Sequence, residues 1–87
     1  MVIMEYLYTA RFLRSFRKLS PAVQDDCCRA VVLFKNKKNE GKIKLHKLHG
    51  KLKKYHAFSV NFVYRIIVKV DKKKVYFMDV GSHTLYK

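Results

Sequence analysis

The chain has little of the material from which disulfide-bonded, disordered or membrane-spanning proteins are built. Its 87 residues include two cysteines, three glycines, one proline and no tryptophan. Cys27 and Cys28 are adjacent in a helical pattern, so they cannot readily bridge to each other and they supply no disulfide framework. No run approaches the roughly 20 apolar residues of a spanning helix. With 49% hydrophobic residues, the composition favours one globular domain over residues 1–87.

The N-terminus lacks the features of an export signal. Its first six residues contain an acid, Glu5, where a secretory signal needs a basic start, and no long apolar run follows. Together with the unpaired cysteines, this pattern predicts a cytoplasmic protein in a reducing compartment.

Acidic residues are also scarce. Six Asp and Glu stand against 20 Lys and Arg, which gives a formal net charge of +14. Such an excess predicts a polyanionic partner, with nucleic acid as the first candidate. A membrane surface is not expected, because the helical segments lack a strongly Lys-rich amphipathic design.

The first half of the chain predicts a strand and two helices. β-forming residues from Val2 to Tyr8 indicate a strand, and Thr9 is a suitable N-cap for a helix with an apolar stripe from Phe12 to Leu19. Ser20-Pro21 begins a second helix whose apolar positions recur with helical spacing as far as Phe34. The short junction between them predicts an antiparallel helix hairpin.

The second half predicts a cationic stretch followed by a meander. Residues 35–54 hold nine lysines and one acid, with loop or edge character. Alternating segments at 55–60, 64–70 and 75–80 predict strands separated by turns at 61–63 and 71–74, the last strand ending at Gly81. The expected fold is α+β, with the helix hairpin packed on one face of a mostly antiparallel four-stranded sheet. His56 and Arg65 are expected on comparable tracks of neighbouring strands.

Four segments together resemble a known family. They are the stretch Phe16–Pro21 in the helix hairpin, the stretch Leu45–Leu52 with the pattern L-x-K-L-x-G, the strand Tyr64–Ile67 that begins with Tyr-Arg-Ile, and the ending Asp79–Tyr86 with the pattern G-x-H-x-x-aromatic. Their order, their spacing and the length and charge of the chain resemble the RelE/ParE superfamily of toxins from bacterial toxin–antitoxin pairs. The resemblance covers nearly the whole chain.

The resemblance implies a function as well as a fold. Members of its ribonuclease branch cut mRNA, usually on the ribosome, without a metal or other cofactor. A 2′-hydroxyl attacks the adjacent phosphorus and leaves a 2′,3′-cyclic phosphate and a 5′-hydroxyl. This chemistry needs a base, an acid and fixed cations around the phosphorane. Histidine suits the first two needs, and arginine suits the third.

Three positions match the family's main site residues. His83 matches a catalytic His or Arg and is the first candidate for proton transfer; the alternative is an exposed histidine near the C-terminus. Arg65 matches an arginine that binds the scissile phosphate, for which its planar fork is well suited; the alternative is a surface cation or an ion pair with Asp79. Tyr86 matches a terminal aromatic that positions the nucleotide.

Further basic residues fill out the expected site. His56 falls where some members carry an assisting lysine, and His46 aligns with a histidine of one subgroup. The pair His46 and His49 also has metal-ligand spacing, but a closed zinc site needs about four ligands and no acids or cysteines lie nearby in the sequence, so no metal is expected. Three lysines are expected to contact RNA phosphates, unless they only solvate a loop: Lys51, Lys53 and Lys54.

The resemblance also implies partners and rival functions. An antitoxin protein is expected to cover the basic surface and block the site, and mRNA and the ribosome are expected as targets. One rival is a ParE-like inhibitor of DNA gyrase, which acts by protein binding. Another is an RNA- or ribosome-binding module without catalysis. Replacing His83 separates these functions, because only the enzyme needs its proton transfer.

Overall fold

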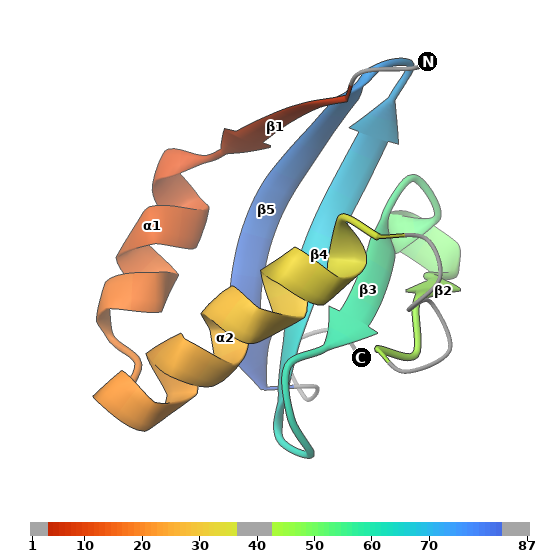
Figure 1. The fold of residues 1–87 in the computed structure, drawn as a ribbon. Coiled ribbons are helices and arrows are strands. Elements are labelled where there is room, and N and C mark those ends of the chain that lie inside the picture. Colours follow the sequence, from red (N-terminus) through yellow and green to blue (C-terminus); the bar gives the residue numbers. More distant parts are fainter. Residues whose placement is uncertain (1–3, 37–42, 83–87) are drawn as a thin grey trace.

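The computed structural model describes residues 4–36 and 43–82 (Figure 1). Strand β1, two helices and a meander follow one another as the sequence predicts. No helix in these two ranges is long and apolar enough to cross a membrane. The elements are β1 (Glu5–Tyr8), α1 (Ala10–Arg17), α2 (Pro21–Phe34), β2 (His46–Lys47), the short 3-10 helix η2 (Gly50–Leu52), β3 (His56–Ser59), β4 (Tyr64–Asp71) and β5 (Lys74–Ser82).

The sheet has the strand order β1-β5-β4-β3-β2. The parallel pair is β1 with β5, and the other neighbours are antiparallel, so the predicted α+β class and the mostly antiparallel sheet are confirmed. The count of four strands was one too low, because the short strand β2 lies in the stretch expected to be loop or edge. Met4 lies outside strand β1, which begins at Glu5, and Val2, where the strand was expected to begin, lies outside the described residues. Strand β5 continues past Gly81 to Ser82.

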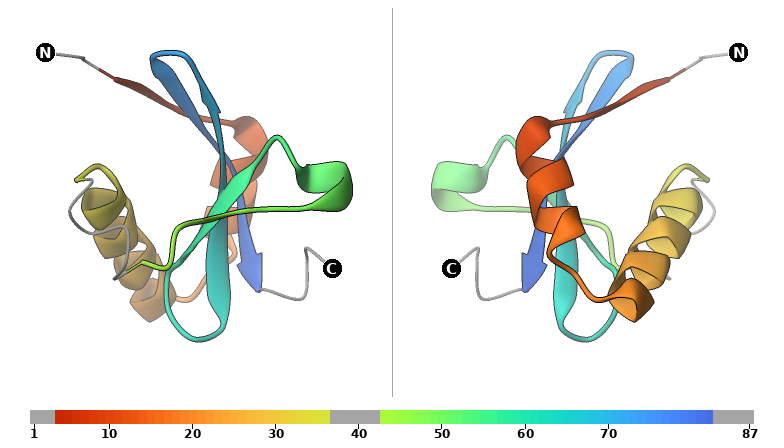
Figure 2. Two further views of the ribbon diagram at one scale, coloured as in Figure 1. Left: turned by 90° about the vertical axis from the view of Figure 1, so that its right-hand side faces the viewer. Right: turned by 90° about the vertical axis from the view of Figure 1, so that its left-hand side faces the viewer.

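Both helices begin at the predicted caps. The Thr9 hydroxyl accepts a bond from the Phe12 backbone N–H at 3.1 Å, and the Ser20 hydroxyl accepts one from Val23 at 3.4 Å. The helices run in opposite directions from the short junction between them, but they splay apart (Figure 2). Gln24 of α2 holds the junction by donating to the Phe16 carbonyl at 3.1 Å.

The core lies between the helices and one face of the sheet. Phe58 and Phe77 are fully buried there, and the Phe34 ring stacks on Phe58 with 4.7 Å between centroids. The pairing of β4 with β5 shifts by one residue at Met78, which lets both Phe77 and Val80 face the core although they are three positions apart. Burying these large side chains supplies most of the drive to fold.

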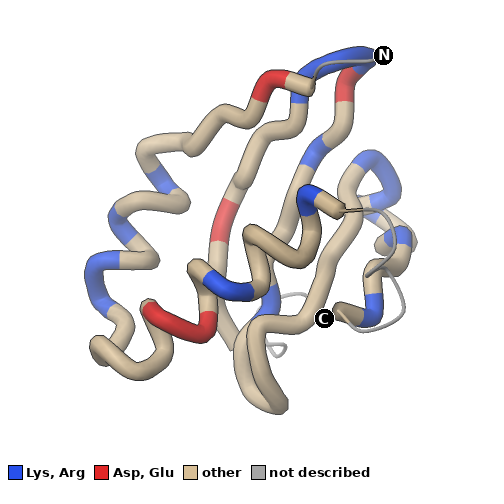
Figure 3. The backbone as a smooth tube through the Cα atoms, in the orientation of Figure 1, with Lys and Arg blue, Asp and Glu red and all other residues tan. Residues whose placement is uncertain are grey.

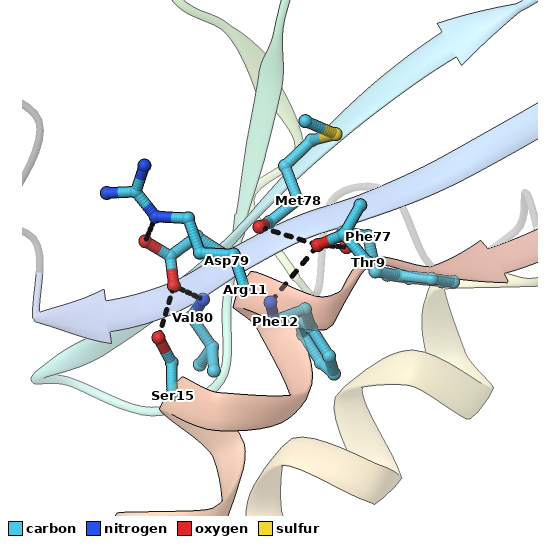
Figure 4. Close-up of polar contacts among 8 residues, drawn as sticks. All are labelled: Thr9, Arg11, Phe12, Ser15, Phe77, Met78, Asp79 and Val80. Atoms are coloured by element: carbon cyan, nitrogen blue, oxygen red, sulfur yellow. Dashed lines mark hydrogen bonds and ion pairs between the residues drawn. The ribbon is translucent and has the colours of Figure 1, made fainter.

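A polar joint fastens α1 to β5 (Figure 4). Asp79 accepts a bond from the Ser15 hydroxyl at 2.6 Å and forms an ion pair with Arg11 at 3.1 Å. The Thr9 hydroxyl lies 3.0 Å from the carbonyl oxygens of both Phe77 and Met78, so the same group caps α1 and bonds to β5. The joint therefore fixes where the first helix sits on the sheet.

Candidate active site on the outer face of the sheet

The strand register sorts side chains onto two faces. Partners in a ladder point to the same side, and neighbours along a strand point to opposite sides. Phe58, Ile66 and Val68 belong to the core and define the helix face. The opposite side, which we call the outer face, carries Ser59 and Arg65, paired with each other. Figure 2 shows the segment around β2 and η2 on this outer side of the sheet.

His56 lies on the helix face. It pairs with Val68, and it lines a hollow between α2 and the sheet together with Tyr6, Phe34 and Leu45. Its Nδ1 atom is buried and has no hydrogen-bond partner among the described residues. The expectation that His56 and Arg65 occupy comparable tracks is therefore wrong, because the pairing of β3 with β4 places them an odd number of positions apart.

His46 lies on the outer face. It pairs with Ala57, which pairs in turn with Ile67 of β4. The exposed His46 ring places Nδ1 2.8 Å from the Lys44 carbonyl oxygen. A carbonyl only accepts, so Nδ1 carries a proton, and in the neutral ring the Nε2 atom is left with a lone pair. This tautomer is the one that a general base at Nε2 requires.

Arg65 is held along the turn between β3 and β4. One guanidinium nitrogen, Nη1, donates to the Asn61 carbonyl at 2.9 Å and to the Tyr64 carbonyl at 3.1 Å. From the ordinary strand spacings, the Cα atoms of His46 and Arg65 lie on the order of 12 Å apart on one face.

The alternative of an ion pair between Arg65 and Asp79 is wrong. Arg65 pairs in the sheet with Gly81, whereas Asp79 pairs with Ile67 and its carboxylate is occupied by Ser15 and Arg11. Asp79 thus belongs to the joint with α1 and not to the candidate site.

The predicted phosphate-binding lysines are exposed. Lys51 lies in η2, and Lys53 and Lys54 follow it. Lys53 and Lys54 line a cationic hollow with Lys47, His56 and Lys69 near the start of β3, where the lining holds a single acid, Asp71. Figure 3 shows Lys and Arg in this segment, along β4 and also on both helices, so the positive charge is spread widely over the described residues.

His83 and Tyr86 lie outside the described residues. In the sequence, His83 follows Gly81 by two positions, and Gly81 pairs with Arg65. Their proposed roles therefore remain predictions. In ranges 4–36 and 43–82, no three His, Cys, Asp or Glu side chains gather as a metal site would need.

Sequence reasoning missed Ser59, which takes the place on the outer face that was expected for His56. Ser59 pairs with Arg65 of the neighbouring strand, so its hydroxyl is on the same face as the candidate phosphate-binding group. The sequence shows the alternation of side chains along β3 and β4, but it does not show which residues of the two strands pair. The turn between the strands sets this register, and Asn61 closes the turn. The Asn61 side-chain oxygen accepts backbone bonds from Val63 and Tyr64, both at 2.9 Å, and so closes the turn.

The chain has the RelE/YafQ-like toxin fold. YafQ from E. coli strain BL21(DE3) superposes with a TM-score of 0.79 at 17% identity, covering 94% of this chain and 96% of YafQ. The toxin–antitoxin complex RelBE2 from Mycobacterium tuberculosis contains a chain that matches with a TM-score of 0.67 at 20% identity, covering 94% and 100%. YoeB from Staphylococcus aureus, solved as a dimer, matches with a TM-score of 0.71 at 15% identity, covering 92% and 97%.

At these identities the likeness concerns the fold, and it confirms the architecture predicted from the sequence. The amino-acid sequence itself matches no protein-family model and no curated protein.

Proposed function

We propose that this chain is the toxin of a toxin–antitoxin pair and that it cleaves mRNA on the ribosome without a metal. The observation that carries the proposal is that His46, in the tautomer of a base, and Arg65, a cation held by the turn, lie on the same outer face of the sheet. The shared fold with YafQ, RelBE2 and YoeB supports it.

In the proposed reaction, the 2′-hydroxyl of one nucleotide gives its proton to a histidine and attacks the adjacent phosphorus. The bond to the 5′-oxygen of the next nucleotide breaks, and that oxygen takes a proton from a second histidine. The products are a 2′,3′-cyclic phosphate and a 5′-hydroxyl. We assign the two proton transfers to His46 and His83 and the stabilisation of the phosphorane to Arg65. Tyr86 would position the nucleotide.

The lysines of the η2 segment would hold the RNA backbone. Lys53 and Lys54 lie beside Lys47 and Lys69 in one hollow, and Lys51 adds an exposed charge. Phosphate contacts of this kind give affinity that falls with added salt and does not depend on sequence. A cognate antitoxin would neutralise this surface with an acidic segment.

Expression of the chain from a tightly controlled promoter in a bacterium tests the proposal. Translation should stop early, and mRNA should acquire new 5′-hydroxyl ends. Arg65→Ala and His83→Ala should each lower cleavage by about 100-fold or more, since fixed cations and proton-transfer groups have effects of this size. Arg14→Ala, which removes an exposed charge of the same kind from α1, is the matched control and should cleave normally.

Two results would assign another function. Arrest of DNA synthesis with intact mRNA would point to gyrase inhibition. Translation arrest that persists in His83→Ala, without new RNA ends, would point to an RNA- or ribosome-binding module that does not catalyse.

A further inference from the structure

The turn between β3 and β4 presents an aromatic side chain to solvent. Phe62 is 93% exposed, more than any other large hydrophobic residue described, and its neighbour Val63 is 51% exposed. Single exposed hydrophobic residues are common on surfaces. Phe62 differs because the backbone beneath it is held in place by several independent bonds.

Those bonds begin at Asn61. Its side-chain oxygen accepts from Val63 and Tyr64, and its carbonyl accepts from Arg65. Its amide nitrogen donates to Asp26 of α2 at 3.3 Å, which ties the turn to the helix. An exposed ring on a fixed turn loses little backbone entropy when it binds a partner.

The surroundings of Phe62 are a hollow with an apolar floor and a cationic rim. The hollow measures about 380 Å³ and lies between α2 and the turn, adjoining the outer face at Ser59 and Arg65. Ala30, Leu33 and Ile43 form the apolar part of its lining, and Arg29, Lys44 and Arg65 are its cations.

One acid, Asp26, lies in the same lining. Arg29 donates to its carboxylate at 2.7 Å, and this bond, followed by that from Asn61, lowers the pKa of Asp26 below its ordinary value. The carboxylate is therefore ionised at neutral pH and is compensated by groups of the protein. Counting Arg29, Lys44 and Arg65 against Asp26, the lining carries a net charge of +2, which attracts an anion.

We propose that Phe62 stacks on an unpaired base of the RNA, beside the candidate catalytic residues, with Arg65 and Lys44 contacting the phosphates that flank this base. A flat ring, an apolar floor and surrounding cations are what single-stranded nucleic acids bind: bases stack on aromatics and phosphates meet basic groups. A protein partner would use the ring as an apolar anchor, but the cationic rim favours the nucleic acid. The inference rests on the proposed function, because it identifies a subsite of the same RNA-binding surface.

The absence of tryptophan from the sequence gives a direct probe. Phe62→Trp carries the chain's only tryptophan, at the ring position in question. A short single-stranded 2′-O-methyl RNA, which lacks the attacking hydroxyl, should quench its fluorescence in a saturable way. Heparin and a duplex of the same sequence, which offer charge without unpaired bases, should give little quenching. Val32→Trp on α2, at a side chain that is 68% exposed, is the control and should not be quenched.

Affinity measurements separate stacking from simple apolar contact. Phe62→Ala and Phe62→Leu should both weaken binding of the same RNA by about tenfold, the size expected from one stacked base. Because Phe62 is exposed, both variants should keep the wild-type circular dichroism spectrum. Full affinity in Phe62→Leu, or RNA that binds Phe62→Trp without quenching it, would overturn the inference. Weakened antitoxin binding with unchanged RNA affinity would also overturn it and would assign the ring to a protein partner.

The readouts keep this inference apart from the ribonuclease proposal. Quenching uses RNA that cannot be cleaved, so it can be present in a protein without nuclease activity. Cleavage by the wild-type chain, with no quenching in Phe62→Trp, would leave the ribonuclease standing and remove the subsite.

Discussion

The two faces of the sheet are built from the same strands but select different residues. On the helix face, Phe58, Ile66 and Phe77 are completely shielded from solvent and pack against α1 and α2. On the outer face, Ser59 and Arg65 sit half-buried, and His46 is exposed beside them. The difference shows that position in the ladder, rather than residue type, decides whether a strand residue faces the helices or the outer side. The two strand histidines, His46 and His56, lie on different faces and illustrate this.

The first prediction tests the contrast between the two faces by removing an aromatic ring from the helix face. Phe77→Ala should lower the free energy of unfolding by about 3–5 kcal/mol, because the ring leaves a cavity among Tyr6, Tyr8, Phe12 and Phe34. Urea denaturation followed by circular dichroism measures the loss. The neighbouring Tyr76→Ala, on the outer face, is the control and should lose less than half as much. Equal losses would mean that both faces contribute equally to the core.

Much of the fold followed from local signals in the sequence, because those signals act over short distances. Thr9 and Ser20-Pro21 mark the helix starts through their own capping bonds, and the alternation in β4 marks its buried residues. The pairing of strands that are distant in the sequence leaves no such local signal in the amino-acid sequence. The strand β2 consists of two exposed residues, and its existence depends on β3 being in place.

The site was harder to predict than the fold, for the same physical reason. Arg65 and His46 were identified through the family resemblance, and the structure places both on the outer face. His56 was misplaced because one residue more or less in the turn at Asn61 exchanges the faces of a whole strand. Phe62 was taken only as part of a turn, since neither composition nor periodicity shows that its ring is exposed.

The second prediction concerns the joint that carries α1. Thr9→Ala removes both the cap of α1 and the hydroxyl contact to the β5 carbonyls, so we expect a loss of about 2 kcal/mol in the free energy of unfolding. Ser20→Ala removes a cap alone, with a longer bond of 3.4 Å, and should lose about 1 kcal/mol or less. Chemical denaturation of the two variants in parallel makes the comparison. Similar losses would show that the contact of Thr9 with β5 contributes nothing.

The third prediction compares the two histidines. His56→Leu replaces a buried ring nitrogen that has no partner among the described residues with an apolar group, so stability should rise by about 1 kcal/mol. RNA cleavage should fall less than in His46→Leu, because His56 pairs with the core residue Val68, although it also lines the cationic hollow beside Lys53 and Lys54. His46→Leu should do the opposite, leaving stability within about 0.5 kcal/mol and lowering cleavage at least tenfold. If His56→Leu loses cleavage, His56 belongs to the active site after all.

The last prediction concerns the two adjacent cysteines, where a buried side chain and an exposed one follow each other in the sequence. Cys27 is buried and Cys28 is exposed. Burial, and secondarily the neighbouring Cys28, raises the pKa of the Cys27 thiol to about 12. Only the thiolate reacts rapidly with maleimides, so the folded chain at pH 8 should take up one label quickly and a second only after unfolding in urea. Two rapid labels on the folded chain would show that α2 does not shield Cys27.

The same thiol gives stability a pH dependence with a defined sign. Between pH 9 and 12 the unfolded chain releases the Cys27 proton while the folded chain keeps it, so the folded state binds more protons and becomes less stable as the pH rises. Other groups also titrate in this range, so the measurement is the difference between wild type and Cys27→Ala. The variant should be less stable by about 1 kcal/mol at pH 7, owing to the small cavity, and this difference should shrink and then change sign as the pH rises above 9. A difference that stays constant up to pH 11 would mean that the Cys27 thiol ionises as easily in the folded chain as in the unfolded one.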